Sequence, residues 1–137
     1  MSNENVELVR RAWDATGTED WPTVVATVHP EAEIYDFDVP DADVYRGHDG
    51  FFRWLDRWNE GWESWRAEDL ELRPIGDDRV IALFRMVARG KHSELELERL
   101  DAIAYRIEDG LIVYMAYFND QEEALQALAG SGQQADD

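Results

Sequence analysis

The sequence predicts an α+β fold: a cone-shaped, curved sheet of mixed or antiparallel strands, packed by N-terminal helices and followed by a short C-terminal helix. Three observations predict it. The first half of the chain shows helical spacing of apolar residues, the second half shows long alternating segments, and 137 residues with 45% apolar content suffice for one core. Strands this long in a short chain must curve, and a curved sheet packed by helices encloses a cone.

The first two helices follow from spacing and from capping residues. Val6, Val9 and Trp13 recur at intervals of three and four, which is typical of an amphipathic helix, and Gly17 is expected to end it. Thr18 then offers a new cap. The second helix is expected to stop near residues 29–30, where a proline follows a histidine.

One strand and a third helix complete the first half. Residues 32–37 alternate in polarity and predict a strand, and residues 38–46 predict a loop because they contain a proline and several turn-forming residues. A third helix is expected from Gly47 to about Gly61. The aromatic density of this helix is unusual for a surface element.

The second half is expected to form four strands that run back and forth. They cover residues 65–75, 79–89, 95–107 and 111–118. Asp109-Gly110 is a strong two-residue hairpin signal between the last two. Asn119 or Asp120 can cap a final helix that closes at Gly130. One domain is therefore expected over residues 1–130, with residues 131–137 as a disordered tail.

Composition excludes several classes of partner. The 13 basic and 31 acidic residues give a net charge of −18, which argues against nucleic acid and against an anionic membrane surface. No apolar run approaches the roughly 20 residues of a membrane span, and the start shows no secretory signal. The absence of cysteine excludes disulfides and thiolate chemistry. A cytoplasmic protein is expected.

No metal and no cofactor are expected. His29, His48 and His92 are scattered, and nothing shows the paired spacing of metal ligands. Neither a glycine-rich phosphate loop nor a nucleophile elbow is present in the sequence.

Six segments, taken in order, resemble the SnoaL-like group of the nuclear transport factor two-like superfamily. They are NVELVRRAWDA, HPEAEIYDFD, VYRGHDGFFRWL, GDDRVIALFRMVARG, YRIEDGLIVYMAYFND and EEALQAL. The resemblance spans roughly residues 5–129. It implies a cone fold that dimerises through its sheet, in a superfamily of ketosteroid isomerases, polyketide cyclases, epoxide hydrolases and non-catalytic binders. Function does not follow from the fold.

Asp36 is the first candidate for chemistry. The resemblance to ketosteroid isomerases implies a proton-transferring aspartate after the first strand, and AEIYDF places Asp36 there. An apolar cleft would raise the pKa of such a carboxyl toward a useful range. The alternative is that Asp36 belongs to a solvated acidic loop with Asp38, Asp41 and Asp43.

Two familiar constellations of the superfamily are incomplete here. The tyrosine of the isomerases falls near Ala12, and their second acid falls near Ile103. The Arg-x-Asp pair of the epoxide hydrolases is present as Arg99 and Asp101, but one strand late. The matching earlier positions are Phe84 and Met86, and the later aspartate becomes Ala116. Neither activity is expected, and Arg99 with Asp101 forms either a structural ion pair or a polar ligand anchor.

The remaining signal is aromatic. If the strand faces follow the family, Tyr114, Ala116 and Phe118 point inward on the last strand. The expected pocket residues are Trp13, Trp54, Trp58, Phe84, Met86, Asp101, Ile103, Ala116 and Phe118. A cavity lined this way suits a polycyclic or steroid-like molecule. The alternative is that these side chains fill the core solidly.

Three functions stay open at this point. The first is a pocket for a small hydrophobic molecule in an isomerase or polyketide-cyclase-type lyase, with Asp36 as acid–base and Tyr114 or Tyr105 as the enolate donor. The second is a non-catalytic binding module. The third is a scaffold that dimerises through the outer face of the sheet, expected to carry Arg85, Val87, Met115 and Tyr117.

Overall fold

The computed structural model describes the backbone of residues 2–38 and 44–136 and the side chains of residues 3–38 and 44–128. The elements are α1 (Ser2–Gly17), α2 (Trp21–Thr27), β1 (Val28–Asp36), β2 (Tyr45–Arg46), α3 (Gly47–Gly61), β3 (Ser64–Ile75), β4 (Arg79–Arg89), β5 (Glu96–Glu108), β6 (Leu111–Phe118) and α4 (Gln121–Asp136). The predicted α+β class is confirmed. The third helix and the strands β4 and β6 have the predicted bounds.

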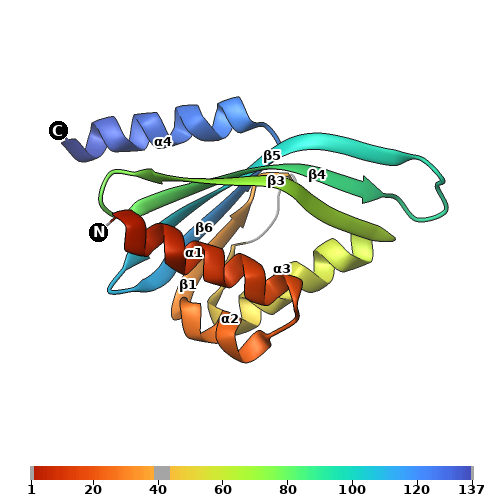
Figure 1. The fold of residues 1–137 in the computed structure, drawn as a ribbon, viewed down its shortest axis with the longest axis horizontal. Coiled ribbons are helices and arrows are strands. Elements are labelled where there is room, and N and C mark those ends of the chain that lie inside the picture. Colours follow the sequence, from red (N-terminus) through yellow and green to blue (C-terminus); the bar gives the residue numbers. More distant parts are fainter. Residues whose placement is uncertain (1, 39–43, 137) are drawn as a thin grey trace.

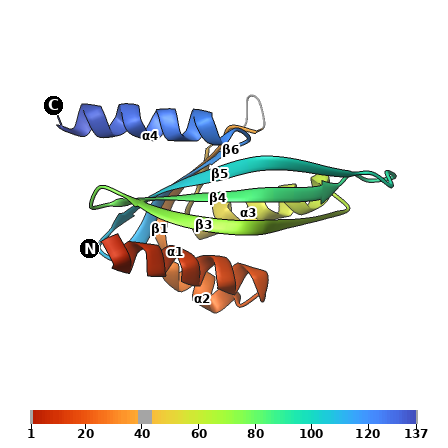
Figure 2. The ribbon, with the colours of Figure 1, turned by 45° about the horizontal axis from the view of Figure 1, so that its top comes forward.

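The strands form one mixed sheet of six, in the order β2-β1-β6-β5-β4-β3. β1 runs parallel to β6, and every other neighbouring pair is antiparallel. Helices α1, α2 and α3 lie on one side of the sheet and α4 lies on the other (Figures 1 and 2). The side that faces α1–α3 is called the inner face below, and the side that faces α4 is called the outer face.

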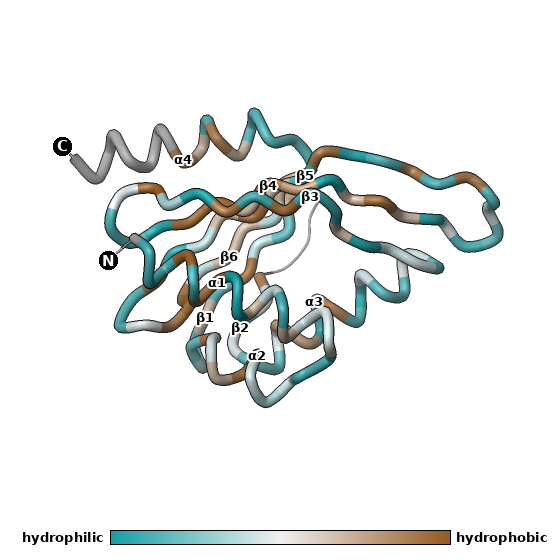
Figure 3. Tube along the Cα trace, in the orientation of Figure 1, coloured by the Kyte–Doolittle hydropathy of each residue, from teal (hydrophilic) through white to brown (hydrophobic). Residues whose placement is uncertain are grey.

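The helix ends follow from local chemistry. Along α1 hydrophobic and hydrophilic residues alternate by turns (Figure 3), as expected of a helix with one apolar side. The cap of α2 is Asp20, whose carboxylate accepts from the Thr23 amide at 3.4 Å and from its hydroxyl at 2.7 Å. The prediction of Thr18 as the cap is therefore wrong, because the Thr18 hydroxyl donates back to Asp14 of α1.

The start of β1 and the end of α4 differ from the prediction by several residues. β1 begins at Val28, before Pro30. Proline is tolerated there because the β1–β6 ladder is irregular between Val28 and Glu33, so Pro30 does not need to donate a backbone N–H. The final helix does not close at Gly130 but continues to Asp136. The division into a domain of residues 1–130 and a tail stays a prediction.

The predicted loop over residues 38–46 contains an unexpected short strand. Residues 39–43 lie outside the described residues, but Tyr45–Arg46 forms β2 and pairs with Glu33 and Ile34 of β1. Gly47 then starts α3 with φ +69°, and a Cβ there would lie 2.6 Å from the Pro30 carbonyl oxygen. Only glycine fits this close approach without strain.

The sheet carries a separate apolar core on each face. The inner core packs α1–α3 against residues that include Val80, Phe84, Met86, Ile103 and Tyr105. The outer core packs α4, through Ala124 and Leu128, against residues that include Ile81, Leu83 and Ala104. No helix among the described residues is long and apolar enough to cross a membrane.

The last strand presents the opposite face from the one predicted. Met115 and Tyr117 belong to the inner core, whereas Ala116, Phe118 and Tyr114 pack in the outer core. The ladder explains the reversal, because Ile107 pairs with Ile112 while its neighbour Arg106 pairs with Tyr114. β6 thus holds one extra residue at this bulge, and one extra residue inverts the alternation of side chains.

Candidate functional site

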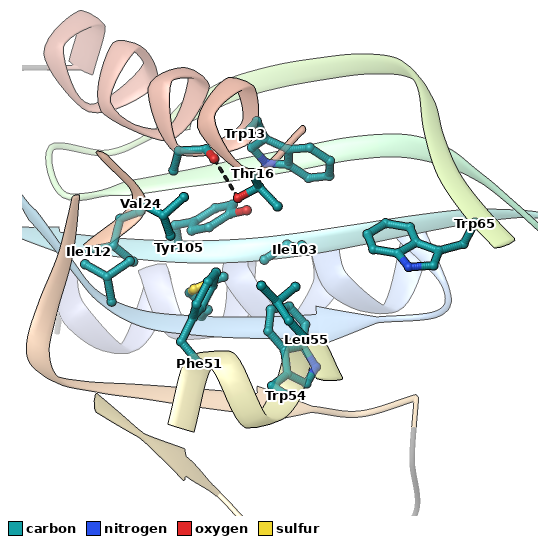
Figure 4. A pocket seen from close by; sticks show the side chains of 13 residues that line it. Trp13, Thr16, Val24, Phe51, Trp54, Leu55, Trp65, Ile103, Tyr105 and Ile112 are labelled. Atoms are coloured by element: carbon teal, nitrogen blue, oxygen red, sulfur yellow. Dashed lines mark hydrogen bonds between the residues drawn. The ribbon is translucent and has the colours of Figure 1, made fainter. Parts of the chain in front are cut away.

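An apolar cavity lies between the N-terminal helices and the inner face of the sheet (Figure 4). Its volume is about 70 Å³, and it is lined by Ala12, Trp13, Thr16, Val24, Val28, Phe51, Trp54, Leu55, Trp65, Ile103, Tyr105, Ile112 and Met115. An engineered protein cavity that binds benzene measures roughly 150 Å³. The cavity therefore holds a small apolar group in this conformation and is too small for a steroid-sized molecule.

Most polar groups around this cavity bond to other parts of the protein. The Thr16 hydroxyl donates to the Ala12 carbonyl at 2.8 Å. The indole N–H of Trp65 donates to Asn59 at 2.9 Å, and that of Trp54 donates to Asp36 at 2.8 Å. The indole N–H of Trp13 is buried and has no hydrogen-bond partner among the described residues.

Tyr105 is the cavity's one phenol, and it lies beside Trp13 (Figure 4). Burial raises the pKa of Tyr105, an effect that the neighbouring Trp13 indole partly offsets. The Trp13 indole thus lies close to the Tyr105 oxygen as a weak donor, but its N–H does not reach the distance and angle of a full hydrogen bond with any described residue. Tyr105 therefore remains a protonated phenol at neutral pH and keeps an O–H that can donate.

Asp36 ends β1 and is almost wholly buried, at 7% exposure. Its Oδ2 accepts the indole N–H of Trp54 at 2.8 Å and that of Trp58 at 2.9 Å. Its Oδ1 accepts the backbone N–H of Asp38 at 2.9 Å. The two tryptophans can share one acceptor because residues four apart lie on the same side of α3.

Asp36 does not line the apolar cavity. It borders a separate groove of about 390 Å³ together with Asp38, Arg57, Trp58, Glu60, Gly61 and Trp62. Trp54 is the link between the two spaces, because its ring lines the cavity while its N–H holds Asp36. The carboxylate is thus neither in an open acidic loop nor inside the apolar cavity. Asp41 and Asp43, the other members of that predicted loop, lie outside the described residues.

A second buried carboxylate lies on the neighbouring strands. Asp101 of β5 is fully buried, and it accepts from Arg99 Nε at 2.6 Å, from Arg99 Nη2 at 2.9 Å and from the Tyr117 hydroxyl. Burial alone would lower the pKa of Arg99, but its bonds to Asp101 and the charges of Asp101 and Asp38 raise it. Burial and the Asp101 charge raise the pKa of Tyr117. The predicted ion pair is present.

The two carboxylates are joined through Asp38. Arg99 Nη1 lies 3.2 Å from Asp38 Oδ1, and the same oxygen accepts from the Asn119 side chain at 3.0 Å. The Asp38 backbone in turn bonds to Asp36. Arg99 of β5 is therefore linked to Asp36 through Asp38.

Apart from Asp36, the residues predicted to be catalytic or to line the pocket fall into three groups. Trp13, Trp54, Ile103 and Tyr105 line the cavity. Trp58, Phe84, Met86 and Asp101 lie on the inner side but belong to the packed core or to the ion pair; Phe84 packs edge-on against Trp13, with ring centroids 5.1 Å apart. Ala116 and Phe118, predicted to line the pocket, and Tyr114, predicted as an enolate donor, lie on the outer face, where they line a groove beside α4. The prediction that they point into the inner cavity is wrong because of the β6 bulge.

Tyr117 is the inner polar residue that the sequence reasoning missed. Its ring packs on Trp58 with centroids 4.8 Å apart, and its hydroxyl bonds to Asp101. No sequence signal marks a bulge in LIVYMAYF, so the face of Tyr117 could not be assigned from alternation. No group of three or more histidine or acidic residues that could hold a metal ion occurs in the described residues.

Comparison with known proteins identifies relatives of this arrangement. Residues 9–115 match the SnoaL-like domain. Among solved structures, an NTF2-like protein from Burkholderia thailandensis is 24% identical, covers 90% of this chain and 96% of its own, and has a TM-score of 0.73. A proposed polyketide cyclase from Xanthomonas campestris pv. campestris is 14% identical with coverage of 93% and 98% and a TM-score of 0.72.

A third solved structure contains a small molecule. TerC, co-crystallised with polyporic acid, is 15% identical, covers 92% of this chain and 98% of its own, and has a TM-score of 0.74. At such identities these three likenesses show a shared fold and no shared activity. A comparison with curated proteins finds no match.

Proposed function

Because the chain belongs to the SnoaL-like domain family, we propose that it binds a small hydrophobic molecule in the cavity between α1, α3 and the inner face of the sheet. The observation that carries the proposal is the lining of this cavity, which contains no charged side chain. Such a space stays dry and favours apolar groups. The solved structure of TerC with polyporic acid is consistent with a binding role for this fold.

Size limits the ligand. The cavity of about 70 Å³ accepts less than one full ring without adjustment, whereas pockets for drug-sized ligands usually span about 300–1,000 Å³. We infer that the ligand inserts one ring or branched alkyl group and that side chains at the rim move to admit it. Trp13 and Trp65 are partly exposed and line the cavity, so they are the groups best placed to move. A polycyclic molecule would leave its other rings outside.

The six tryptophans provide the test. Three of them, Trp13, Trp54 and Trp65, line the cavity, and the other three do not. Toluene titrated into ¹⁵N-labelled protein should shift the indole N–H signals of the lining residues in a saturable way. The signal of Trp21, which packs on Phe52 away from the cavity, should stay in place. Equal shifts of all six signals, or none, would contradict the proposal.

A cavity-filling pair of variants supplies the control. Ala12→Leu adds three carbons to a lining residue of α1 and should abolish the toluene-dependent shifts. Ala127→Leu makes the same change on the exposed side of α4, across the sheet, and should leave them unchanged. Binding that survives Ala12→Leu would place the ligand elsewhere.

Proton transfer by Asp36 is a second candidate function, and one observation favours it. Asp36 is a buried carboxylate whose donors include the cavity-lining Trp54, so a ligand that displaces this indole would meet Oδ2. The carboxylate would then take a proton from the carbon beside a carbonyl, and Tyr105 would donate to the enolate oxygen. Tyr114 has no part in this scheme, because it lies on the outer face.

Enzyme activity is testable without knowing the substrate. Exchange of the α-hydrogens of cyclohexanone for deuterium in D₂O, followed by proton NMR, detects enolisation directly. Wild-type protein should accelerate the exchange and Asp36→Asn should not. Equal rates with the two proteins would leave the non-catalytic binding role as the function.

We also propose that the chain forms a homodimer through the outer face of its sheet. Phe37 and Leu100 are more than half exposed, at 53% and 58%, and Arg85 of the outer face lies in a network with Glu68 and Glu98. Met115 and Tyr117 have no part in this surface, since they point inward. Light scattering after gel filtration should give twice the chain mass of 15.9 kDa, and Leu100→Glu should give monomers.

A further inference from the structure

We propose that the cavity selects hydrophobic molecules that carry one uncharged acceptor oxygen, such as a ketone, and that the Trp13 indole N–H binds this oxygen. The inference rests on the proposed ligand-binding function and names the ligand class. The donor belongs to a side chain of α1 that lines the cavity, and its binding to a ligand does not require turnover.

The first support is the contrast among the three tryptophans that line the cavity. Trp54 donates to Asp36 and Trp65 donates to Asn59, so their N–H groups are used outside the cavity. Trp13 Nε1 is buried and has no partner in the described part of the chain. Buried donors in native proteins nearly always have an acceptor. A ligand oxygen in the cavity would supply the missing one.

The second support is the position of Tyr105. Its hydroxyl lies near enough to Trp13 for the indole to affect its pKa, yet the two make no hydrogen bond of normal geometry. Burial raises the pKa of Tyr105, which keeps the phenol protonated. A hydroxyl hydrogen can rotate toward a new acceptor. Both side chains border the same cavity (Figure 4), so we infer that an oxygen beside Trp13 Nε1 would meet the Tyr105 hydroxyl as a second donor.

The other lining residues indicate which chemical groups the ligand should not carry. None of the 13 lining residues is charged, and the only hydroxyl besides Tyr105 belongs to Thr16, which donates to Ala12. An ionised ligand would lose its hydration without gaining a counter-charge. A ligand rich in N–H or O–H donors would find few acceptors. One carbonyl oxygen on an apolar ring matches both donors and the apolar walls.

The test compares two compounds of nearly equal shape. Cyclohexanone carries the acceptor oxygen, and methylenecyclohexane has a CH₂ group in its place. Dissociation constants for both are measured by indole N–H titration with wild type, Trp13→Phe and Trp65→Phe. Loss of one hydrogen bond should change the ratio of the two constants by about fivefold in Trp13→Phe. Trp65→Phe, whose lost N–H bonds to Asn59, should keep the wild-type ratio.

A measurement on the wild type covers the case in which a variant fails to fold. The Trp13 indole proton should move downfield with cyclohexanone and not with methylenecyclohexane. If both compounds bind with the same ratio in all three proteins, or move the Trp13 proton alike, the acceptor site is wrong and the hydrophobic pocket stands. If neither compound binds at saturating concentration, the pocket proposal fails and this inference fails with it.

Discussion

Trp54 connects the apolar cavity to the Asp36 carboxylate: its ring lines the cavity and its indole N–H donates to Asp36 Oδ2 at 2.8 Å. One turn further along α3, Trp58 donates to the same oxygen at 2.9 Å. A molecule in the cavity can therefore contact a side chain that also bonds to the carboxylate. A ligand that moves the Trp54 indole would therefore change the hydrogen bonding of the Asp36 carboxylate.

The two indole bonds should contribute measurably to stability. Trp54→Phe or Trp58→Phe each removes a donor to a buried charged group, and each should lower the free energy of unfolding by about 2 kcal/mol. The double variant should cost more than the sum of the two single variants, because the Asp38 amide would be the one donor left to Asp36 among the described residues. Urea unfolding measures these changes. Losses below a few tenths of a kcal/mol would show that these bonds do not form.

The buried ion pair predicts an asymmetric response to substitution. Arg99→Met leaves Asp101 buried without its counter-charge, which should destabilise the fold by about 3–5 kcal/mol. Arg99→Met with Asp101→Leu and Tyr117→Phe removes Asp101 together with both side chains that bond to its carboxylate, and this triple variant should be more stable than the single variant. Chemical unfolding measures the free energy of unfolding of both variants. A triple variant less stable than Arg99→Met would contradict this account of the pair.

Arg99 should also position Asp36, through its ion pair with Asp38. In Arg99→Lys, the bidentate contact to Asp101 is lost while the positive charge stays. The indole N–H signals of Trp54 and Trp58 should shift in this variant, because they report on the carboxylate that they contact. The signal of Trp21 is the internal control. Unchanged signals for Trp54 and Trp58 would show that Arg99 does not position Asp36.

Alkaline pH should weaken the fold through the buried phenols. Burial raises the pKa of Tyr105, and burial together with Asp101 raises that of Tyr117. Above about pH 10 the unfolded chain loses these protons and the folded chain keeps them, so the free energy of unfolding falls as pH rises. Below that pH this contribution is fully present.

Tyr105→Phe isolates one of these phenols. Each tyrosine that keeps its proton only in the folded chain makes the free energy of unfolding fall by a further amount of about 1.4 kcal/mol per pH unit. The variant should therefore lose stability less steeply than the wild type when urea unfolding is repeated between about pH 9 and about pH 11. Parallel slopes for the two proteins would mean that Tyr105 titrates alike in the folded and unfolded chains.

Alanine substitution should affect stability differently at the two ends of α3. Gly47 has φ +69° and its added Cβ would meet the Pro30 carbonyl at 2.6 Å, so Gly47→Ala should destabilise by about 2 kcal/mol or more. Gly61 has nothing within 4 Å and should be neutral or gain up to about 1 kcal/mol as alanine. Thermal unfolding of the two variants measures these changes in stability. Equal effects would contradict the assigned start of the helix.

The sequence predicted the architecture because its signals are local. Alternation gave β4 and β6 with their correct bounds, and a glycine at each end gave α3. The short β2 could not be predicted, since two residues carry no periodic pattern and pair only with a strand more than ten residues earlier. The cap of α2 was misassigned because Thr18 and Asp20 are both good caps and only the turn geometry separates them.

The candidate site was predicted only in part. Asp36 and the tryptophans of α3 were recognised, but their mutual bonds depend on how α3 packs on β1, which no local pattern encodes. The bulge in β6 reversed the faces of Tyr114 and Tyr117, so the sequence placed the wrong tyrosine inside. The size of the cavity depends on how completely the aromatic rings interdigitate, which side-chain packing alone determines.

The most direct test of the central claim is a crystal structure of the protein soaked with cyclohexanone. We expect density for the ring in the cavity between Trp13, Trp54 and Leu55, with its oxygen within about 3 Å of Trp13 Nε1. An interior closed by packed side chains, or ligand density confined to the outer face of the sheet, would contradict it.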